Sequence, residues 1–196
     1  LVDSGNATST TTLTVSIAGA NDAPVITADA EVGDSAAEGV TETDSSLSTS
    51  GILSVQDVDT ADSVTVSVSA VVASGVTTGL LSDNAALLAM MSVDAGAVID
   101  ATQTTGTIHW AFGSGAEAFD HLAEGETLTL TYTLTVDDGT ATSTHDVVVT
   151  VTGTNDVPVI GGVDASDVTE DTAVASDLIS TQGQLTIADA DHGQSN

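Results

Sequence analysis

A long internal repeat sets the strictest limit on the fold of this chain. Residues 2–10, Val-Asp-Ser-Gly-Asn-Ala-Thr-Ser-Thr, return in similar form as residues 136–144, and residues 19–26 return as residues 153–160. Both pairs share an offset of 134 in residue number. A repeat of this length predicts a tandem array of similar domains, because each unit is long enough to bury its own core.

A third pair of similar segments, residues 51–59 and 183–191, has an offset of 132, a difference that a loop of variable length explains. The repeat divides the chain into three parts. Residues 1–22 are predicted to end one repeat, residues 23–156 to form a complete repeat, and residues 157–196 to begin the next. We therefore expect a piece of a longer array in which the middle unit alone is whole.

Alternation of apolar and polar residues predicts strands in the complete unit. The clearest is 127–136, where every second residue is apolar and the others are threonine, as in a half-buried antiparallel strand. Asp138 and Gly139 predict a hairpin turn after it. The predicted strands are 24–28, 51–56, 63–72, 92–99, 106–112, 127–136 and 145–152. Short strands with tight turns predict an all-β fold, a Greek-key two-sheet sandwich of the immunoglobulin or cadherin type.

Two short helices are predicted to close the ends of this sandwich. The first covers residues 82–91, with Ser82 as its N-cap, and the second covers residues 116–124, with Gly125 as its C-cap. Both are additions to a β architecture and carry none of the predicted chemistry.

The composition of the chain limits the kinds of partner that it can bind. It contains 29 Asp and Glu, no Lys or Arg and no Cys, for a formal net charge of −29. Without cationic side chains it has no phosphate clamp for nucleic acid and no basic face for an anionic membrane. No stretch approaches the roughly 18 apolar residues of a membrane span. Disulfides and Cys-bound zinc are excluded as well.

Strand parity predicts that the acidic residues gather at the two ends of the domain. Because consecutive strands of a sandwich alternate in direction, each loop can be assigned to one end. The incoming linker, the loop after the second strand and the hairpin after the sixth strand share one end: Asn21, Asp22, Asp57, Asp59, Asp137 and Asp138. The opposite end is predicted to gather Glu42, Asn155, Asp156, Asp189 and Asp191, with Glu170 as the counterpart of Glu42 one unit later.

Carboxylates gathered in this way require a counter-ion. Two of them at 4 Å repel by about 1 kcal/mol in water and by more at a partly buried site. No Lys or Arg is available to neutralise them. We expect Ca²⁺, which accepts 6 to 8 oxygen ligands in flexible geometry, in preference to Mg²⁺, which demands a near-ideal octahedron and loses water reluctantly.

Each acidic turn, taken singly, also has a simpler interpretation. The turn after the sixth strand forms with or without a metal ion, and residues 155–158 could be a plain linker turn. The Asp-x-Asp pair that recurs at residues 57–59 and 189–191 is more specific. Its recurrence favours calcium at the junctions between units.

Other chemistry is poorly supported, and we predict that the chain is not an enzyme. It has no serine-nucleophile elbow, no phosphate-binding loop and no dinucleotide fingerprint. Its turn acids lack the aromatic cleft of a glycoside hydrolase. The four histidines show no metal-ligand spacing: His109, His121, His145 and His192. Trp110, Phe112 and Tyr132 are predicted to fill the core, with sugar stacking as the less favoured role of the first two.

In combination, several segments resemble the VCBS repeat of giant bacterial surface adhesins, part of the cadherin-like repeats of type I-secreted proteins. They are residues 51–59, 106–112, 119–132, 137–139 and 153–160. The resemblance implies a rigid extender domain on the outside of a bacterial cell, with Ca²⁺ at its junctions, serving adhesion or biofilm formation. The similar cadherin arrangement implies shared ions on Asn155, Asp156, Asp189, Asp191 and Glu42.

Three functional hypotheses follow. The first is a calcium-binding structural module whose partners are neighbouring repeats of the same chain. The second is a filament-forming or glycan-binding module, in which edge strands or sheet faces bind sugar or pair with another copy, because residues 1–22 and 157–196 offer unpaired strands. The third, a hydrolase, would need turnover that survives chelation and is lost when the turn acids are replaced.

Overall fold

The computed structural model describes residues 4–163, 167, 181–191 and 193. Apart from one short α-helix and one 3-10 turn, the assigned elements of these residues are strands, so the protein is all-β as predicted. In chain order the elements are β1 (Val25–Thr27), η1 (Ala30–Val32), β2 (Ala37–Thr41), β3 (Ser48–Gln56), β4 (Val64–Gly75), α1 (Asn84–Ala89), β5 (Met91–Val93), β6 (Ala97–Ile99), β7 (Thr105–Gly113), β8 (Thr127–Asp137), β9 (Thr142–Thr152), β10 (Val159–Gly162) and β11 (Leu185–Ala188).

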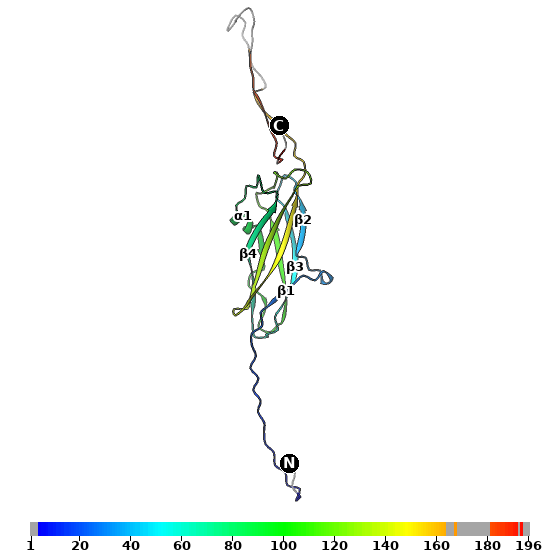
Figure 1. Ribbon diagram of the computed structural model, residues 1–196, viewed down its shortest axis with the longest axis vertical. Helices are drawn as coiled ribbons and strands as arrows, with labels where there is room; N and C mark the ends of the chain where they lie inside the picture. The colour runs from blue at the N-terminus through cyan, green and yellow to red at the C-terminus, as the bar shows by residue number, and fades with distance from the viewer. Residues whose placement is uncertain (1–3, 164–166, 168–180, 192, 194–196) are drawn as a thin grey trace, which may run out of the picture.

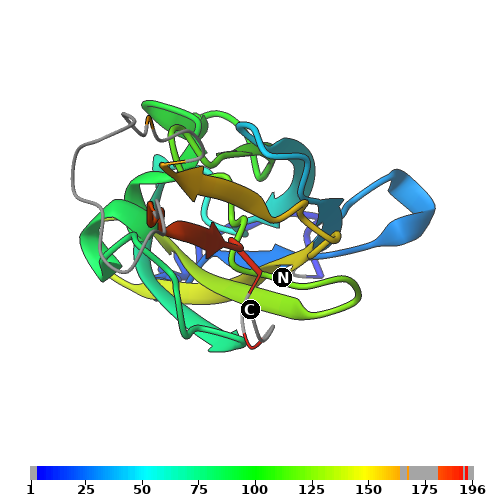
Figure 2. The same cartoon turned by 90° about the horizontal axis from the view of Figure 1, so that it is seen from above.

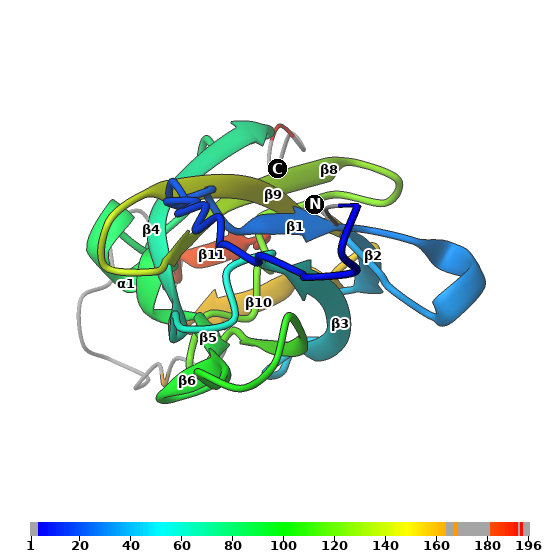
Figure 3. The ribbon, with the colours of Figure 1, turned by 90° about the horizontal axis from the view of Figure 1, so that it is seen from below.

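The strands form three sheets. One has the order β1-β3-β7-β5, a second has the order β2-β9-β8-β4-β6, and a third pairs β10 with β11. All pairings are antiparallel except β2 with β9, which is parallel. Viewed along the long axis, β8 and β9 lie on one side of the molecule and β3 and β5 on the other (Figure 3).

The core lies between the four-stranded and five-stranded sheets. The apolar face predicted for β8 is fully buried, with Tyr132 and its alternating neighbours at 0 % exposure. Phe112 of β7 contacts Tyr132 across the two sheets, with ring centroids 6.3 Å apart. Trp110 is also buried and donates from Nε1 to the carbonyl of Ser35 at 2.9 Å. These aromatic residues therefore have the core roles predicted from strand parity.

Gly51 makes room for the indole of Trp110. A Cβ at this position would stand 2.6–2.9 Å from three indole atoms. The strand β3 passes this closely over the ring because residue 51 has no side chain. The Gly51 position and the Ser35 carbonyl together fix the orientation of the largest core side chain.

Several sequence-based assignments were wrong. The predicted strand 92–99 is two strands, β5 and β6, which belong to different sheets. A turn at Gly96, with φ of +92°, separates them. The predicted helix 116–124 is absent, and that segment consists of turns and irregular backbone. The first predicted helix is shorter than expected and begins after Asp83, whose side chain caps it by accepting from the Ala86 amide at 2.8 Å.

Strand β2 was missed, since its Ala-Glu-Gly-Val-Thr sequence lacks the alternation of a half-buried strand. It runs parallel to β9, whereas the prediction assumed strands of strictly alternating direction.

The pairing of β1 with β3 has a counterpart in the pairing of β10 with β11. Ile26 lies opposite Val55 in the first pair, and Ile160 lies opposite Ile187 in the second. The residue numbers differ by 134 on one side of the pairing and by 132 on the other, the same two offsets as in the sequence repeat. The β10–β11 pair lies beyond one end of the larger sheets and the N-terminal segment leaves the other end (Figures 1 and 2).

Asp34 fastens the loop before β2 to the four-stranded sheet. It is 8 % exposed, and its Oδ2 accepts from the backbone N–H groups of Asp29 and Ser54, both at 3.0 Å. Its Oδ1 accepts from the Ser54 hydroxyl at 3.2 Å. Burial tends to raise the pKa of Asp34, but these hydrogen bonds outweigh it and hold the pKa below its ordinary value of 3.8.

Replacing Asp34 by Asn is expected to lower the free energy of unfolding by about 1–2 kcal/mol at neutral pH, because the two backbone N–H groups would donate to a neutral amide oxygen in place of a charged carboxylate. A carboxyl whose folded-state pKa is depressed stabilises the fold above its unfolded-state pKa and ceases to do so as the pH falls through the folded-state value. Urea unfolding at pH 7 and below pH 3.8 should therefore show the difference shrinking in acid. Asp100→Asn, at an exposed acid, is the control, and a pH-independent difference would contradict the role of the charge.

Candidate metal centres

Three carboxylates meet in the loop that follows β3. Asp57, Asp59 and Asp62 each offer one oxygen within 4.8 Å of the others, and we call them the incoming cluster. Asp57 is 2 % exposed. The backbone N–H of Asp59 donates to Asp57 Oδ1 at 3.0 Å, a local bond that folds the Asp-x-Asp segment back on itself. The sequence predicted the first two of these acids, and Asp62 was missed.

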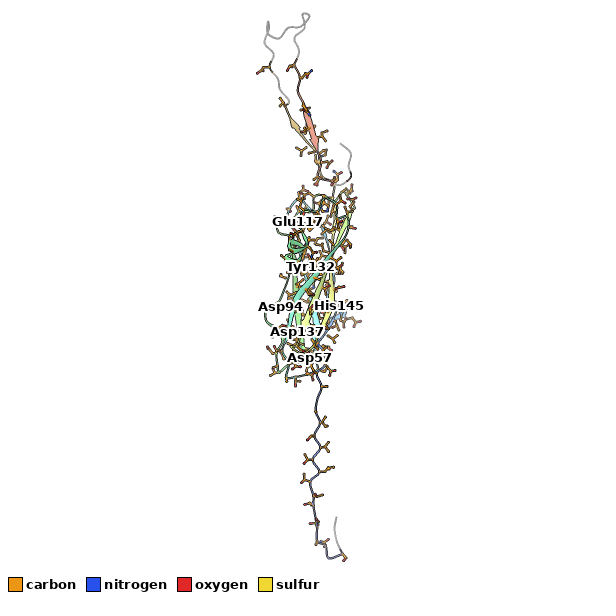
Figure 4. The ribbon with its side chains drawn as sticks, turned by 60° about the vertical axis from the view of Figure 1, so that its left-hand side comes forward. Asp57, Asp94, Glu117, Tyr132, Asp137 and His145 are labelled. Atoms are coloured by element: carbon orange, nitrogen blue, oxygen red, sulfur yellow. The ribbon has the colours of Figure 1, made fainter. Side chains whose placement is uncertain are left out.

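The incoming linker and the β8–β9 hairpin reach this cluster. The backbone N–H of Asp22 donates to Asp59 Oδ2 at 2.7 Å, and Asn21 Nδ2 donates to Asp138 Oδ2 at 3.1 Å. Asp57 and Asp137 lie near the end of the domain from which the N-terminal segment leaves (Figure 4). The structure therefore brings together residues that lie more than a hundred positions apart in the sequence.

The negative charges of the incoming cluster repel one another. Burial, together with the charges of Asp59, Asp138 and Asp57, raises the pKa of Asp62 above its ordinary value. Asp57 Oδ2 is buried and has no hydrogen-bond partner among the described residues. A buried carboxylate oxygen without a donor is costly, so this atom could serve as a ligand to a cation.

A second group of carboxylates lies at the opposite end of the domain. Glu42, Asp44 and Asp120 each offer one oxygen within 4.8 Å of the others, and we call them the outgoing cluster. Glu42 is fully buried. Its Oε1 accepts from the N–H of Thr154 at 2.8 Å and also from the Thr154 hydroxyl, so it ties the end of β2 to the outgoing linker.

The β10–β11 pair contributes acids to the same place. The backbone N–H of Asp156 donates to Asp191 Oδ2 at 3.0 Å, and the N–H of Asp191 donates to Asp189 Oδ1 at 3.3 Å. A cleft of about 530 Å³ separates the domain from the β10–β11 pair. Carboxylates from both sides line it, among them Asp44, Asp120, Asp156 and Asp189.

Burial and neighbouring negative charges raise the pKa of two carboxyl groups at this end of the domain. Burial, a hydrogen bond with Asp44 and the charges of Asp44, Glu42 and Asp191 raise the pKa of Asp156 to about 7. Burial, with the charges of Asp44, Glu42 and Glu117, raises the pKa of Asp120. Asp120 Oδ1 is buried without a hydrogen-bond partner among the described residues. A proton or a cation has to relieve this repulsion at neutral pH.

Strained backbone positions two residues at the outgoing cluster. Asp44 has φ of +52° and Phe119, directly before Asp120, has φ of +67°. A left-handed conformation costs of order 1 kcal/mol or more for an aromatic residue, and such residues gather at functional sites. The fully buried ring of Phe119 holds the turn that presents Asp120.

The two linkers make the same hydrogen bonds. Asn21 Nδ2 donates to the carbonyl of Asp22 at 3.1 Å, as Asn155 Nδ2 does to that of Asp156 at 2.7 Å. The bond from the Asp22 amide to Asp59 corresponds to the bond from the Asp156 amide to Asp191. The contact within residues 57–59 corresponds to that within residues 189–191.

The structure places most of the predicted site residues in these two groups, while their role as metal ligands stays a prediction. At the incoming end it joins Asn21, Asp22, Asp57, Asp59 and Asp138, and at the outgoing end Glu42, Asp156, Asp189 and Asp191, with Asn155 lining the cleft. The side chain of Asp137 caps the hairpin instead, accepting from the Gly139 amide at 2.7 Å. Glu170 lies outside the described residues.

Three acids of the clusters were missed from the sequence. Asp62 stands three residues after an Asp-x-Asp pair, and Asp44 follows Glu42 in a Glu-x-Asp pair. Those short spacings are the signals that could have found them. Asp120 has no local signal, because only the packing of the β7–β8 loop against the end of β2 brings it to the cluster.

The donors of both clusters are hard oxygen atoms, which suit Ca²⁺, Mg²⁺ or Mn²⁺ and not a soft metal. The protein is thus an all-β domain with an acidic cluster at each end that could hold a metal ion. His109 lies elsewhere, with Nδ1 3.0 Å from Asp94 Oδ2.

No protein-family model matches the chain, and no curated protein matches it. Among solved structures it is similar to the CooA pilin subunit of enterotoxigenic Escherichia coli, with a TM-score of 0.42 and 12% identity over 67% of this chain and 97% of the pilin. It is also similar to a PapD-like domain of human CEP192, with a TM-score of 0.39 and 9% identity over 74% of this chain and 96% of that domain.

A third similar structure is a family 123 glycoside hydrolase from Clostridium perfringens, with a TM-score of 0.42 and 9% identity. That match covers 66% of this chain and 27% of the hydrolase. No helix in the described part of the chain is long and apolar enough to cross a membrane.

Proposed function

We propose that this chain is a non-catalytic calcium-binding extender module of a bacterial cell-surface adhesin, built of Greek-key sandwich domains that recur at the offset of 134 seen in the sequence. The observation that carries the proposal is the cleft between the complete domain and the β10–β11 pair. Asp44 and Asp120 line it from one side and Asp189 from the other. A cation bound there joins two bodies that would otherwise repel each other.

The same cation would stiffen the connection between domains. The outgoing linker is already held on both sides, by Glu42 through Thr154 and by Asp191 through the Asp156 amide. These bonds do not relieve the burial of the Asp156 carboxyl or its repulsion by nearby carboxylates, which together raise its pKa. A divalent ion removes that repulsion and turns the linker into a rigid joint.

The two clusters are the two halves of one kind of junction. The outgoing cluster supplies the upstream half, with Glu42, Asp44 and Asp120, and the incoming cluster supplies the downstream half. The equivalent hydrogen bonds of the two linkers support this correspondence between the two ends of the domain. Because one Ca²⁺ takes 6 to 8 oxygens, a complete junction with this many carboxylates has ligands for more than one ion.

The proposed setting is the outside of the cell. Extracellular calcium modules bind at roughly 10⁻⁴ to 10⁻³ M, so such a junction fills in calcium-rich surroundings and stays empty in cytosol. The partners are neighbouring repeats, and the resulting rod would carry a distal adhesive domain away from the surface.

Spin labels test whether calcium stiffens the outgoing junction. The chain contains no cysteine, so Thr144→Cys and Thr186→Cys would label one exposed site on β9 and one on β11. We expect a narrow distance distribution by pulsed electron paramagnetic resonance in calcium and a broad one in chelator. Equal widths in both conditions would count against the proposal.

A matched pair of variants separates the junction from general electrostatics. Asp191→Ala removes the acceptor of the Asp156 amide and should leave the distribution broad even in calcium. Asp146→Ala removes one negative charge from the exposed face of β9, where the carboxylate accepts from the Thr133 hydroxyl at 2.9 Å. The Asp146 variant should respond to calcium like the wild-type chain.

A further inference from the structure

An exposed leucine stands at the end of the domain next to the β10–β11 pair. Leu81 is 91 % exposed and lines a hollow of about 460 Å³. Phe119 and His121 of the complete domain line the same hollow, and Ala190, directly after β11, lines it as well. Glu117, another lining residue, lies at the end of the domain nearest to the β10–β11 pair (Figure 4). Leu81 and Ala190 thus border one hollow from the two sides of the outgoing junction.

The loop that carries Leu81 is held in place by its own domain. The backbone N–H and the hydroxyl of Ser82 both donate to Glu117 Oε2, at 3.0 Å and 2.7 Å. Gly79, with φ of +98°, passes so close to His121 that a Cβ there would stand 2.8 Å from the Cβ of His121. Because these contacts fix the backbone on both sides of Leu81, its side chain is held outside the core of its own domain.

The incoming end of the domain carries the surface that faces such a leucine in an array. A hollow of about 440 Å³ there is lined by Asp22, Ala23, Val25, Gln56, Asp57 and Val58. At the two repeat offsets, the counterparts of these six residues are Asp156, Val157, Val159, Ala188, Asp189 and Ala190. All six counterparts line the cleft between the complete domain and the β10–β11 pair. The surface that is open at the incoming end is therefore the one that faces an upstream domain at the outgoing end.

We propose that the side chain in the middle of the Asp-x-Asp segment packs against the leucine at position 81 of the preceding repeat, as an apolar contact beside the metal site. At the incoming end this side chain is Val58, which is 69 % exposed, and at the outgoing end it is Ala190. Valine has two more carbon atoms than alanine to bury, so a junction with valine closes more firmly. The inference rests on the repeat organisation of the proposed function and adds a part of the joint that needs no metal ion.

A double-mutant cycle at the outgoing junction tests this contact. The chain labelled at Thr144→Cys and Thr186→Cys is compared with chains that also carry Ala190→Val, Leu81→Ser or both, all in chelator. We expect Ala190→Val to increase the narrow component of the distance distribution about two- to tenfold, because the added carbon atoms are buried when the junction closes. Leu81→Ser should cancel this gain. Since Leu81 is exposed, its replacement leaves the core of the domain intact.

Ala190→Thr is the matched control for shape. Threonine is branched at Cβ like valine and has nearly the same volume, but its hydroxyl gains little from apolar burial. The threonine variant should therefore keep a distribution close to that of the labelled parent chain.

Three outcomes would overturn the proposal. Ala190→Val could narrow the distribution equally in the Leu81→Ser background, Ala190→Thr could narrow it as much as Ala190→Val, or Ala190→Val could leave it unchanged. None of these outcomes alters the response of the parent chain to calcium, and a parent chain that ignores calcium can still pass all three tests. The failure of the apolar contact and the failure of the calcium joint are thus distinguishable.

Discussion

Calcium at 10 mM is expected to raise the melting temperature of the chain by roughly 5–10 °C for each site that it fills. If only the folded form binds, a concentration about 100-fold above Kd stabilises by about 2.7 kcal/mol, and each kcal/mol shifts the midpoint of a domain this size by about 2–4 °C. Differential scanning calorimetry in calcium, magnesium and chelator measures this. Magnesium should act more weakly, because the clusters lack a rigid octahedral cage.

For the variant Asp57→Asn, the difference in melting temperature from the wild-type chain should change sign between chelator and calcium. The amide oxygen can still accept from the Asp59 amide, while the negative charge is removed together with Oδ2, which has no hydrogen-bond partner in the described ranges. In chelator the variant should melt at or above the wild-type temperature, because one repelling charge is gone. In calcium it should melt below it, because a ligand is gone. Asp146→Asn is the charge-matched control on the face of β9.

Two results would contradict the calcium interpretation. One is a wild-type chain whose melting temperature is the same in calcium and chelator. The other is an Asp57→Asn variant whose melting temperature still rises in calcium as much as that of the wild-type chain. To isolate the incoming cluster, calcium is titrated into chains that also carry Asp120→Asn, which weakens the outgoing cluster.

Gly153→Ala is expected to destabilise the domain by about 3 kcal/mol and to lower its melting temperature by roughly 5–10 °C. A Cβ at this position would stand 2.1 Å from the carbonyl oxygen of Leu122 and 2.5 Å from that of Ala123. Both are backbone oxygen atoms, so no change of side-chain rotamer can relieve the clash. The loop must move, and this loop carries Asp120, so calcium binding at the outgoing cluster should weaken too.

Gly113→Ala is the matched control for this steric effect. Gly113 ends β7, its φ lies outside the left-handed region, and a Cβ there would meet nothing within 4 Å. It should melt within about 2 °C of the wild-type chain, as is usual for surface substitutions. A Gly153→Ala variant as stable as the Gly113→Ala variant would show that the loop adjusts freely.

Alternation was a reliable guide where one face of a strand is buried and the other is open. In β8, threonine and apolar residues alternate without interruption, and the buried positions are those the sequence predicts. Helical composition was a poor guide at residues 116–124, where the positive φ of Phe119 and the packing of its ring prevent a helix. Local propensity is a weak signal, and buried contacts decided that segment.

The acidic residues of the clusters were likewise predicted only in part. Counting strand directions was enough to predict that Asp22 and Asp59 approach each other, although 37 residues separate them. It could not predict Asp120, because the count assigns a loop to an end of the domain but does not say which side chain points inward. That choice depends on the backbone angle of Phe119 and on contacts with the end of β2.

Residue type and spacing along the chain were enough to predict the all-β class, the buried faces of β7 and β8 and the excess of negative charge. The three-dimensional packing was needed to establish the parallel pairing of β2 and the membership of Asp44, Asp62 and Asp120 in the clusters. It was also needed to show which carboxylate oxygens are buried without a donor from the described part of the chain. These depend on distances between segments remote in sequence, which local patterns do not encode.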